Sequence, residues 1–135
     1  MAANASPKIR ILIVDDLARV RQGLRTILEL SEEFEVVGEA GNGLEAIRLS
    51  EELKPEVILM DMAMPKLGGI EATQRIKECY PEIGIVIITI HDDASARRQA
   101  TQAGADAFVG KEADTETLIE TIREVREKTS PKLIP

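Results

Sequence analysis

Five short apolar segments, each followed by a stretch with apolar residues at helical spacing, constrain the fold of this chain more than any other feature. They lie at 9–14, 34–40, 57–60, 83–89 and 106–109. The first and fourth, IRILIV and IGIVIIT, alternate little between apolar and polar residues, which is typical of strands buried on both faces of a parallel sheet. We therefore predict an α/β fold with a doubly wound, five-stranded parallel sheet covered by helices on both faces.

The intervening stretches predict five helices. Apolar residues at spacings of three or four mark the first three, between Leu17 and Leu28, Leu44 and Leu53, and Ile70 and Tyr80. The fourth is expected at 94–103 with an inner face of alanines only, namely Ala96, Ala100 and Ala103. The last is expected to begin after Asp114, a favourable N-cap residue, with Leu118, Ile122 and Val125 on its inner face.

Length and charge limit the possible functions. The chain has 135 residues, which suits one domain: we assign 1–7 to a disordered N-terminus, 8–128 to the domain and 129–135 to the start of a linker or a frayed end. No apolar run approaches the ~20 residues of a membrane span, so we expect no membrane association. The net charge of −7 disfavours nucleic-acid binding by this domain alone.

The scarcity of cysteine and histidine excludes several kinds of site. Cys79 is the only cysteine and cannot form an internal disulfide, which is consistent with a cytoplasmic protein. His91 is the only histidine, so a metal site built from several histidines is excluded. Any metal bound here must be held by oxygen ligands.

Polar side chains follow four of the predicted strands at the point where each strand ends. Asp15 and Asp16 follow the first, Asp61 follows the third, Thr89 closes the fourth, and Lys111 comes two residues after the fifth. Sites in open parallel sheets form beyond the carboxyl ends of the strands, so we expect these five side chains to converge. Taken singly, each has an ordinary explanation, such as helix capping by Asp15 or Asp16, or a solvated surface lysine at Lys111.

Three clustered carboxylates repel one another and call for a cation. Two charges ~4 Å apart repel by roughly 4 kcal/mol at an effective dielectric constant of 20. A purely oxygen ligand set favours Mg²⁺, with Mn²⁺ as an alternative. With a lysine beside it, such a site suits a phosphoryl group, and an aspartate is a candidate acceptor.

Four segments carry a resemblance to a known family: ILIVDD, VILMDMAMPKLGGIEA, IVIITIHDD and AGADAFVGK. Over residues 8–128 the sequence resembles the receiver domain of two-component response regulators. The resemblance implies a flavodoxin-like fold with strand order 2-1-3-4-5. It also implies phosphorylation of Asp61 by a partner sensor histidine kinase, in a protein that is not a conventional enzyme.

The resemblance also implies a role for each matching residue. Asp61 would be the phosphoryl acceptor and would bind Mg²⁺ together with Asp16 and the backbone carbonyl of Ala63, whereas Asp15 would act through a bound water. Thr89 and Lys111 would contact the phosphoryl oxygens, and Thr89 and Phe108 would form the conformational switch. His91, two positions after Thr89, is a possible modulator of phospho-aspartate lifetime, with a plain loop histidine as the alternative.

Two residues depart from the family pattern. Glu112 follows Lys111 where many receivers have a proline with a cis peptide bond, so no cis bond is expected there. Ile90 follows Thr89 where a small residue is common, which could narrow access to Asp61.

The stretches GIEAT and TIHDD are most similar to the branch that carries a C-terminal LuxR-type helix-turn-helix domain. This similarity implies transcriptional output through a DNA-binding domain absent from this chain, and a phosphorylation-linked homodimer. A stand-alone receiver that acts through protein–protein contacts is the alternative.

Three rival functions fit the residues less well. A phosphatase of the haloacid dehalogenase type needs a second aspartate two residues after the first, where this chain has Ala63. An FMN-binding flavodoxin needs a phosphate-binding loop after the first strand and aromatic residues to stack the flavin. Here the strand ends in two carboxylates, and aromatic residues are 2% of the chain. The complete set of five polar residues argues against a receiver that is never phosphorylated.

Overall fold

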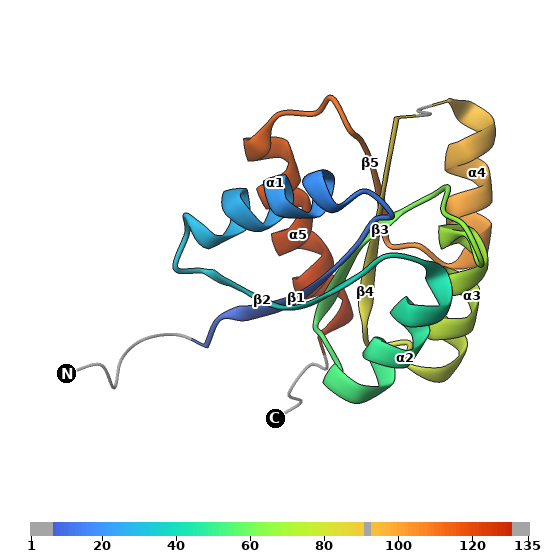
Figure 1. Ribbon diagram of the computed structural model, residues 1–135, viewed down its shortest axis with the longest axis horizontal. Coiled ribbons are helices and arrows are strands. Elements are labelled where there is room, and N and C mark those ends of the chain that lie inside the picture. The colour runs from blue at the N-terminus through green and yellow to red at the C-terminus, as the bar shows by residue number, and fades with distance from the viewer. Residues whose placement is uncertain (1–6, 91–92, 131–135) are drawn as a thin grey trace.

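The computed structural model describes residues 7–90 and 93–130, in which strands and helices alternate along the chain (Figure 1). The elements are β1 (Ile9–Val14), α1 (Ala18–Glu29), β2 (Phe34–Ala40), α2 (Gly43–Leu53), β3 (Val57–Asp61), α3 (Gly69–Cys79), β4 (Gly84–Thr89), α4 (Ala94–Ala103), β5 (Ala107–Gly110) and α5 (Thr115–Thr129). Within the described part of the chain, no helix is both long enough and apolar enough to cross a membrane.

The strands form one parallel sheet in the order β2-β1-β3-β4-β5. The predicted fold class and strand order are therefore confirmed. The predicted limits of three strands differ by one residue: β3 extends to Asp61, β4 begins at Gly84, and β5 is shifted by one residue at both ends to Ala107–Gly110. Since β3 lies at the centre of the sheet with all five of its residues buried, it carries Asp61 to the edge from the interior of the protein.

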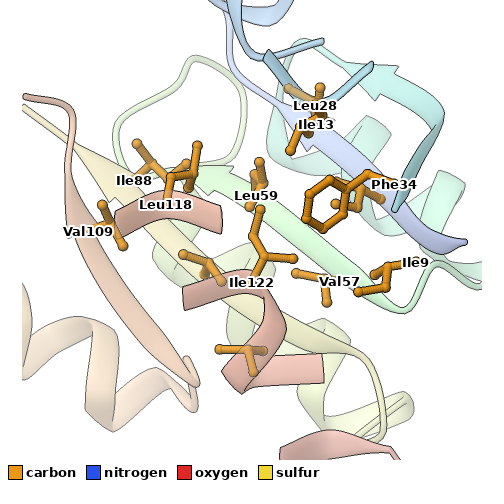
Figure 2. Close-up of a cluster of buried hydrophobic side chains, with 13 residues drawn as sticks. Ile9, Ile13, Leu28, Phe34, Val57, Leu59, Ile88, Val109, Leu118 and Ile122 are labelled. Carbon is orange, nitrogen blue, oxygen red and sulfur yellow. The ribbon is translucent and has the colours of Figure 1, made fainter. Parts of the chain in front are cut away.

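Each face of the sheet packs against its own hydrophobic cluster. Figure 2 shows the first cluster, where Leu118 and Ile122 of α5 lie against the sheet near Leu59 and Ile88. On the opposite face, Ala46, Ala72, Ile76 and Ala100 of α2, α3 and α4 cover the other side of the strands. Side chains of opposite orientation along one strand, such as Ile58 and Leu59, enter different clusters, as strand geometry requires.

The helix ends agree with the sequence in part. Asp114 caps α5 by accepting a hydrogen bond from the Thr117 N–H, as predicted. The N-cap of α1 is Leu17, which makes no side-chain capping hydrogen bond, so the alternative in which Asp15 or Asp16 caps that helix is wrong. On α4, Ala96, Ala100 and Ala103 are the buried residues, which confirms the predicted alanine face.

Candidate metal and phosphoryl site

The polar residues at the strand ends converge at one edge of the sheet. Asp15, Asp16 and Asp61 each place a carboxylate oxygen within 4.8 Å of the others. The Lys111 ammonium lies 2.9 Å from Asp15 Oδ2 and 3.3 Å from Asp61 Oδ1. Thr89 is buried at the end of β4, and its backbone carbonyl accepts a 2.8 Å hydrogen bond from the Lys111 N–H. The structure thus brings together three carboxylates and an ammonium from the loop after β1, the end of β3 and the loop after β5.

Asp61 lies in an environment that opposes its ionisation. Its side chain is almost wholly buried, and burial together with the nearby charge of Asp15 raises its pKa from 3.8 to about 6, although Lys111 acts in the opposite direction. Burial lowers the pKa of Lys111, but its hydrogen bond to Asp15 and the charge of Asp61 outweigh that effect, so its pKa is raised. The lysine therefore remains cationic, and it offsets only part of the cost of ionising Asp61.

The two consecutive aspartates after β1 differ in burial and in hydrogen bonding. Asp15 is buried, and both of its carboxylate oxygens are engaged: Oδ1 accepts from the Leu17 N–H at 2.9 Å, and Oδ2 accepts from Lys111. Asp16 is exposed, and its carboxylate has no hydrogen-bond or ion-pair partner among residues 7–90 and 93–130. Asp16 is therefore the carboxylate available to a new ligand, whereas Asp15 already has structural partners.

The donor set fits a hard divalent cation. The three carboxylates offer oxygen atoms only, and oxygen-only sites favour Mg²⁺, Mn²⁺ or Ca²⁺ over the metals that prefer imidazole or thiolate. A cation would also stabilise the ionised form of Asp61, whose pKa is raised in the protein alone. Ala63, whose carbonyl is the other expected ligand, is exposed two residues after Asp61.

The loop after Asp61 is held by two glycines at which a side chain would not fit. A Cβ at Gly69 would overlap the carbonyl oxygen of Asp61, and the Gly69 N–H donates to the Met62 carbonyl at 2.9 Å. A Cβ at Gly43 would lie 2.5 Å from the carbonyl oxygen of Leu67, which accepts a 2.9 Å hydrogen bond from the Gly43 N–H. The first residues of α2 and α3, Gly43 and Gly69, therefore fix the path of the chain around the site. Sequence patterns did not predict this role for Gly43.

The residues expected to form the switch lie beside the site. Phe108 is half-buried against the cluster under α2, α3 and α4, and the Arg97 guanidinium carbon lies 4.8 Å from the centre of its ring. Ile90 is 65% exposed, so its side chain is not packed over the acidic cluster. No cis peptide bond occurs in the described segments, so the bond between Lys111 and Glu112 is trans. His91 lies outside the described residues.

The order of the strands and the position of the acidic cluster define the class of this protein. It is a doubly wound α/β protein whose site lies beyond the carboxyl ends of the strands, next to the point where the strand order reverses between β1 and β3. The sequence model of a protein family, the response regulator receiver domain, matches residues 11–123 of this chain. The chain belongs to the response regulator receiver domain family.

Two relatives are, by name, a transcriptional regulatory protein and a response regulator. The chain is 41% identical over 118 residues to the transcriptional regulatory protein DegU of Brevibacillus brevis, covering 87% of this chain and 50% of DegU. It is 38% identical over 117 residues to the response regulator GacA of Pseudomonas aeruginosa, covering 87% of this chain and 55% of GacA. The chain thus spans about half the length of the curated relatives it matches.

Solved structures show the same architecture. A LuxR-family two-component response regulator from Aurantimonas sp. SI85-9A1 superimposes with a TM-score of 0.86 at 35% identity, covering 90% of this chain and 87% of that one. The response regulator domain of Thermotoga maritima CheB gives a TM-score of 0.83 at 33% identity, covering 96% of this chain and all of that one (100%).

Proposed function

We propose that this receiver domain accepts a phosphoryl group on Asp61 from the phosphohistidine of a sensor histidine kinase, with Mg²⁺ as the cofactor. The observation that carries the proposal is the convergence of Asp15, Asp16 and Asp61 with the Lys111 ammonium at one edge of the sheet. When bound, Mg²⁺ would neutralise charge on the aspartates and on the phosphoryl oxygens. Asp16, Asp61 and the Ala63 carbonyl would hold it, and Asp15 would contribute through water.

The protein's residues supply position and charge for the transfer. An Asp61 carboxylate oxygen forms a bond to phosphorus while the phosphorus–nitrogen bond to the kinase histidine breaks, and the electron pair remains on the departing imidazole nitrogen. Lys111 is placed to pair with the phosphoryl oxygens, since it already lies 3.3 Å from Asp61 Oδ1. Because Asp61 is buried at the end of a central strand, its position is set by the sheet rather than by a mobile loop.

The phosphoryl group would also shift a conformational equilibrium. New charge-assisted hydrogen bonds from Thr89 and Lys111 contribute ~1.5–3 kcal/mol each. Two of them are comparable with the ~5.5 kcal/mol that takes a two-state equilibrium from 1:99 to 99:1. Movement of Thr89 toward the phosphate would leave space for Phe108 to turn inward, which changes the face formed by α4, β5 and α5. A phosphorylation-linked homodimer would use the changed surface.

The output of the proposed switch is transcription. DegU and GacA, which are transcriptional and response regulators by name, are about twice as long as the matched segment. We propose that the domain controls a DNA-binding domain that is not part of this chain, acts in the cytoplasm and is not a conventional enzyme. A stand-alone receiver that acts through protein contacts is the alternative.

The test is phosphorylation by a small donor. Wild-type protein and Asp61→Asn are incubated with Mg²⁺ and acetyl phosphate and analysed by intact mass in parallel with samples containing EDTA. We expect the phosphoryl mass increment only in the wild type and only with Mg²⁺. Equal labelling of the two proteins would overturn the assignment of Asp61, and labelling that persists in EDTA would overturn the role of the metal.

A further inference from the structure

Arg21 of α1 connects the acidic site to β2, the strand at one side of the sheet. Its Nη1 donates a 2.6 Å hydrogen bond to the backbone carbonyl of Asp15, and its Nε donates to Glu39 Oε1 of β2 at 3.0 Å. The Arg21 side chain is 21% exposed, so these contacts are largely shielded from solvent.

With Arg21 included, every polar group of Asp15 has a partner. Its N–H donates to the Ala40 carbonyl at 3.0 Å, its carbonyl accepts from Arg21, and its two carboxylate oxygens accept from Leu17 and Lys111. The backbone and side chain of Asp15 are therefore held in place by β2, by α1 and by the loop that carries Lys111. The next residue, Asp16, is exposed and is the proposed metal ligand. Its position relative to Asp61 depends on how firmly residue 15 is held.

We propose that Arg21 is a positioning residue for the divalent-cation site: by holding the Asp15 carbonyl and Glu39 together, it sets the direction in which Asp16 presents its carboxylate. The inference rests on the proposed function, because it takes the acidic cluster to be a cation site. Arg21 touches neither the cation nor the phosphoryl group, and it acts only through the backbone of the turn.

The chain offers a matched control in Arg25. Arg25 lies one helical turn further along α1 and donates to the other oxygen of the same glutamate, Glu39 Oε2, at 2.7 Å, but no contact joins it to Asp15. Arg21 and Arg25 therefore share charge, helix and Glu39 as a partner, and only Arg21 contacts the Asp15 carbonyl. Arg25 also forms an exposed i,i+4 pair with Glu29 at 2.9 Å, so a loss of Mg²⁺ affinity that is specific to the Arg21 variant reports on the carbonyl contact.

Because Arg21 is positively charged, the direction of the change in cation affinity distinguishes the loss of its charge from the loss of its contact with Asp15. Loss of a positive charge near a cation site strengthens cation binding by simple electrostatics. Loss of the Arg21 hydrogen bond to the Asp15 carbonyl weakens cation binding, since removal of outer-shell partners typically lowers metal affinity about 10- to 100-fold. A weaker affinity in an arginine variant therefore cannot come from the charge.

The experiment measures Mg²⁺ affinity of the full chain by following ¹H–¹⁵N NMR shifts, in wild type, Arg21→Met, Arg25→Met and Asp16→Asn. Methionine keeps the apolar stem and removes the donors. We expect Arg21→Met to raise the Mg²⁺ dissociation constant about 10-fold. Arg25→Met should leave it within about 2-fold of wild type or lower it, because that substitution removes a charge and the pairs with Glu29 and Glu39 but no contact with Asp15. Urea unfolding of each variant gives its stability separately.

The outcomes separate the two proposals. Equal dissociation constants for Arg21→Met and Arg25→Met, with wild-type binding that is lost in Asp16→Asn, would overturn the role of Arg21 and leave the proposed function standing. Absence of Mg²⁺ binding by the wild type, or binding unchanged in Asp16→Asn, would overturn the proposed cation site itself. If Arg21→Met does not fold, Arg21→Lys replaces it: the shorter lysine has one nitrogen in place of the separate Nη1 and Nε donors to the Asp15 carbonyl and Glu39 and cannot reproduce their geometry. The same weakening, in smaller degree, is therefore expected, and its absence would refute the inference.

Discussion

Replacement of Asp61 by asparagine is expected to stabilise the protein at neutral pH. The pKa of Asp61 is about 6 in the folded protein, against 3.8 for the carboxyl group in its ordinary state. Because one pKa unit corresponds to 1.36 kcal/mol, ionisation of Asp61 costs the folded state about 3 kcal/mol. Asparagine is close in shape, has no charge to bury, and can still accept a hydrogen bond from Lys111. We therefore expect Asp61→Asn to raise the free energy of unfolding by up to about 3 kcal/mol at pH 7–8 in the absence of Mg²⁺.

The pH dependence follows from the direction of the shift. A carboxyl group whose folded pKa is raised keeps its proton in the folded protein at a pH where the unfolded chain has lost it. The contribution of Asp61 to wild-type stability therefore falls as the pH rises from about 4 to about 6, and the full penalty is present above that window. The advantage of Asp61→Asn should be small near pH 4, should grow through this window, and should be constant above it.

Urea unfolding followed by circular dichroism is a suitable assay, since the chain has no tryptophan to report by fluorescence. Asp114→Asn is the control, because hydrogen bonds from Thr117 lower the pKa of Asp114. Its carboxylate therefore stabilises the folded state above its unfolded pKa, and its loss should have the opposite sign at neutral pH. An Asp61→Asn variant that is no more stable than wild type at pH 8, or whose advantage does not change between pH 4 and 7, would refute the reasoning.

Three further substitutions test the packing around the site. Gly69→Ala should lower stability by about 1–3 kcal/mol and reduce labelling by acetyl phosphate, since its Cβ would overlap the Asp61 carbonyl; Gly68→Ala, whose Cβ would meet only one atom at 3.4 Å, is the control and should label normally. Thr73→Val should raise the urea midpoint, because the buried Thr73 hydroxyl has no hydrogen-bond partner in the described structure and such groups cost about 1–3 kcal/mol; a lower midpoint would contradict this. Gly23→Ala should stabilise α1 by about 0.5–1 kcal/mol, because nothing lies within 4 Å of the added methyl group; thermal unfolding at an unchanged or lower temperature would show that the glycine is needed.

The sequence was sufficient for the elements and for the residues that meet at the strand ends. The predicted limits of β1, β2 and α4 agree with the structure, and the N-cap Asp114 correctly indicated the start of α5. The topology of a parallel sheet then places Asp15, Asp61 and Lys111 together whatever the lengths of the connecting helices. These features depend on local patterns and on one rule of topology, both of which are present in a single sequence.

The supporting contacts could not be predicted in the same way. Arg21 holds a backbone carbonyl, and every residue has one, so no pairing of residue types indicates the contact. Asp15 has structural partners and Asp16 is free for a ligand because only the Asp15 side chain enters the interior at the end of β1. Two neighbouring aspartates in a sequence do not show which of them is buried. The close approach of Gly43 to Leu67 joins the start of α2 to the loop between β3 and α3 and depends on backbone positions alone.

The alanine face of α4 determines what kind of movement this helix can make. Ala96, Ala100 and Ala103 each project a single methyl group toward the sheet, so no long side chain is seated in a socket beneath the helix. A helix held by large side chains must jump between discrete positions, since each step lifts a knob out of its hole. A face of single methyl groups interlocks little with the sheet, so two positions of α4 that differ by a fraction of a turn can both be packed without a large void.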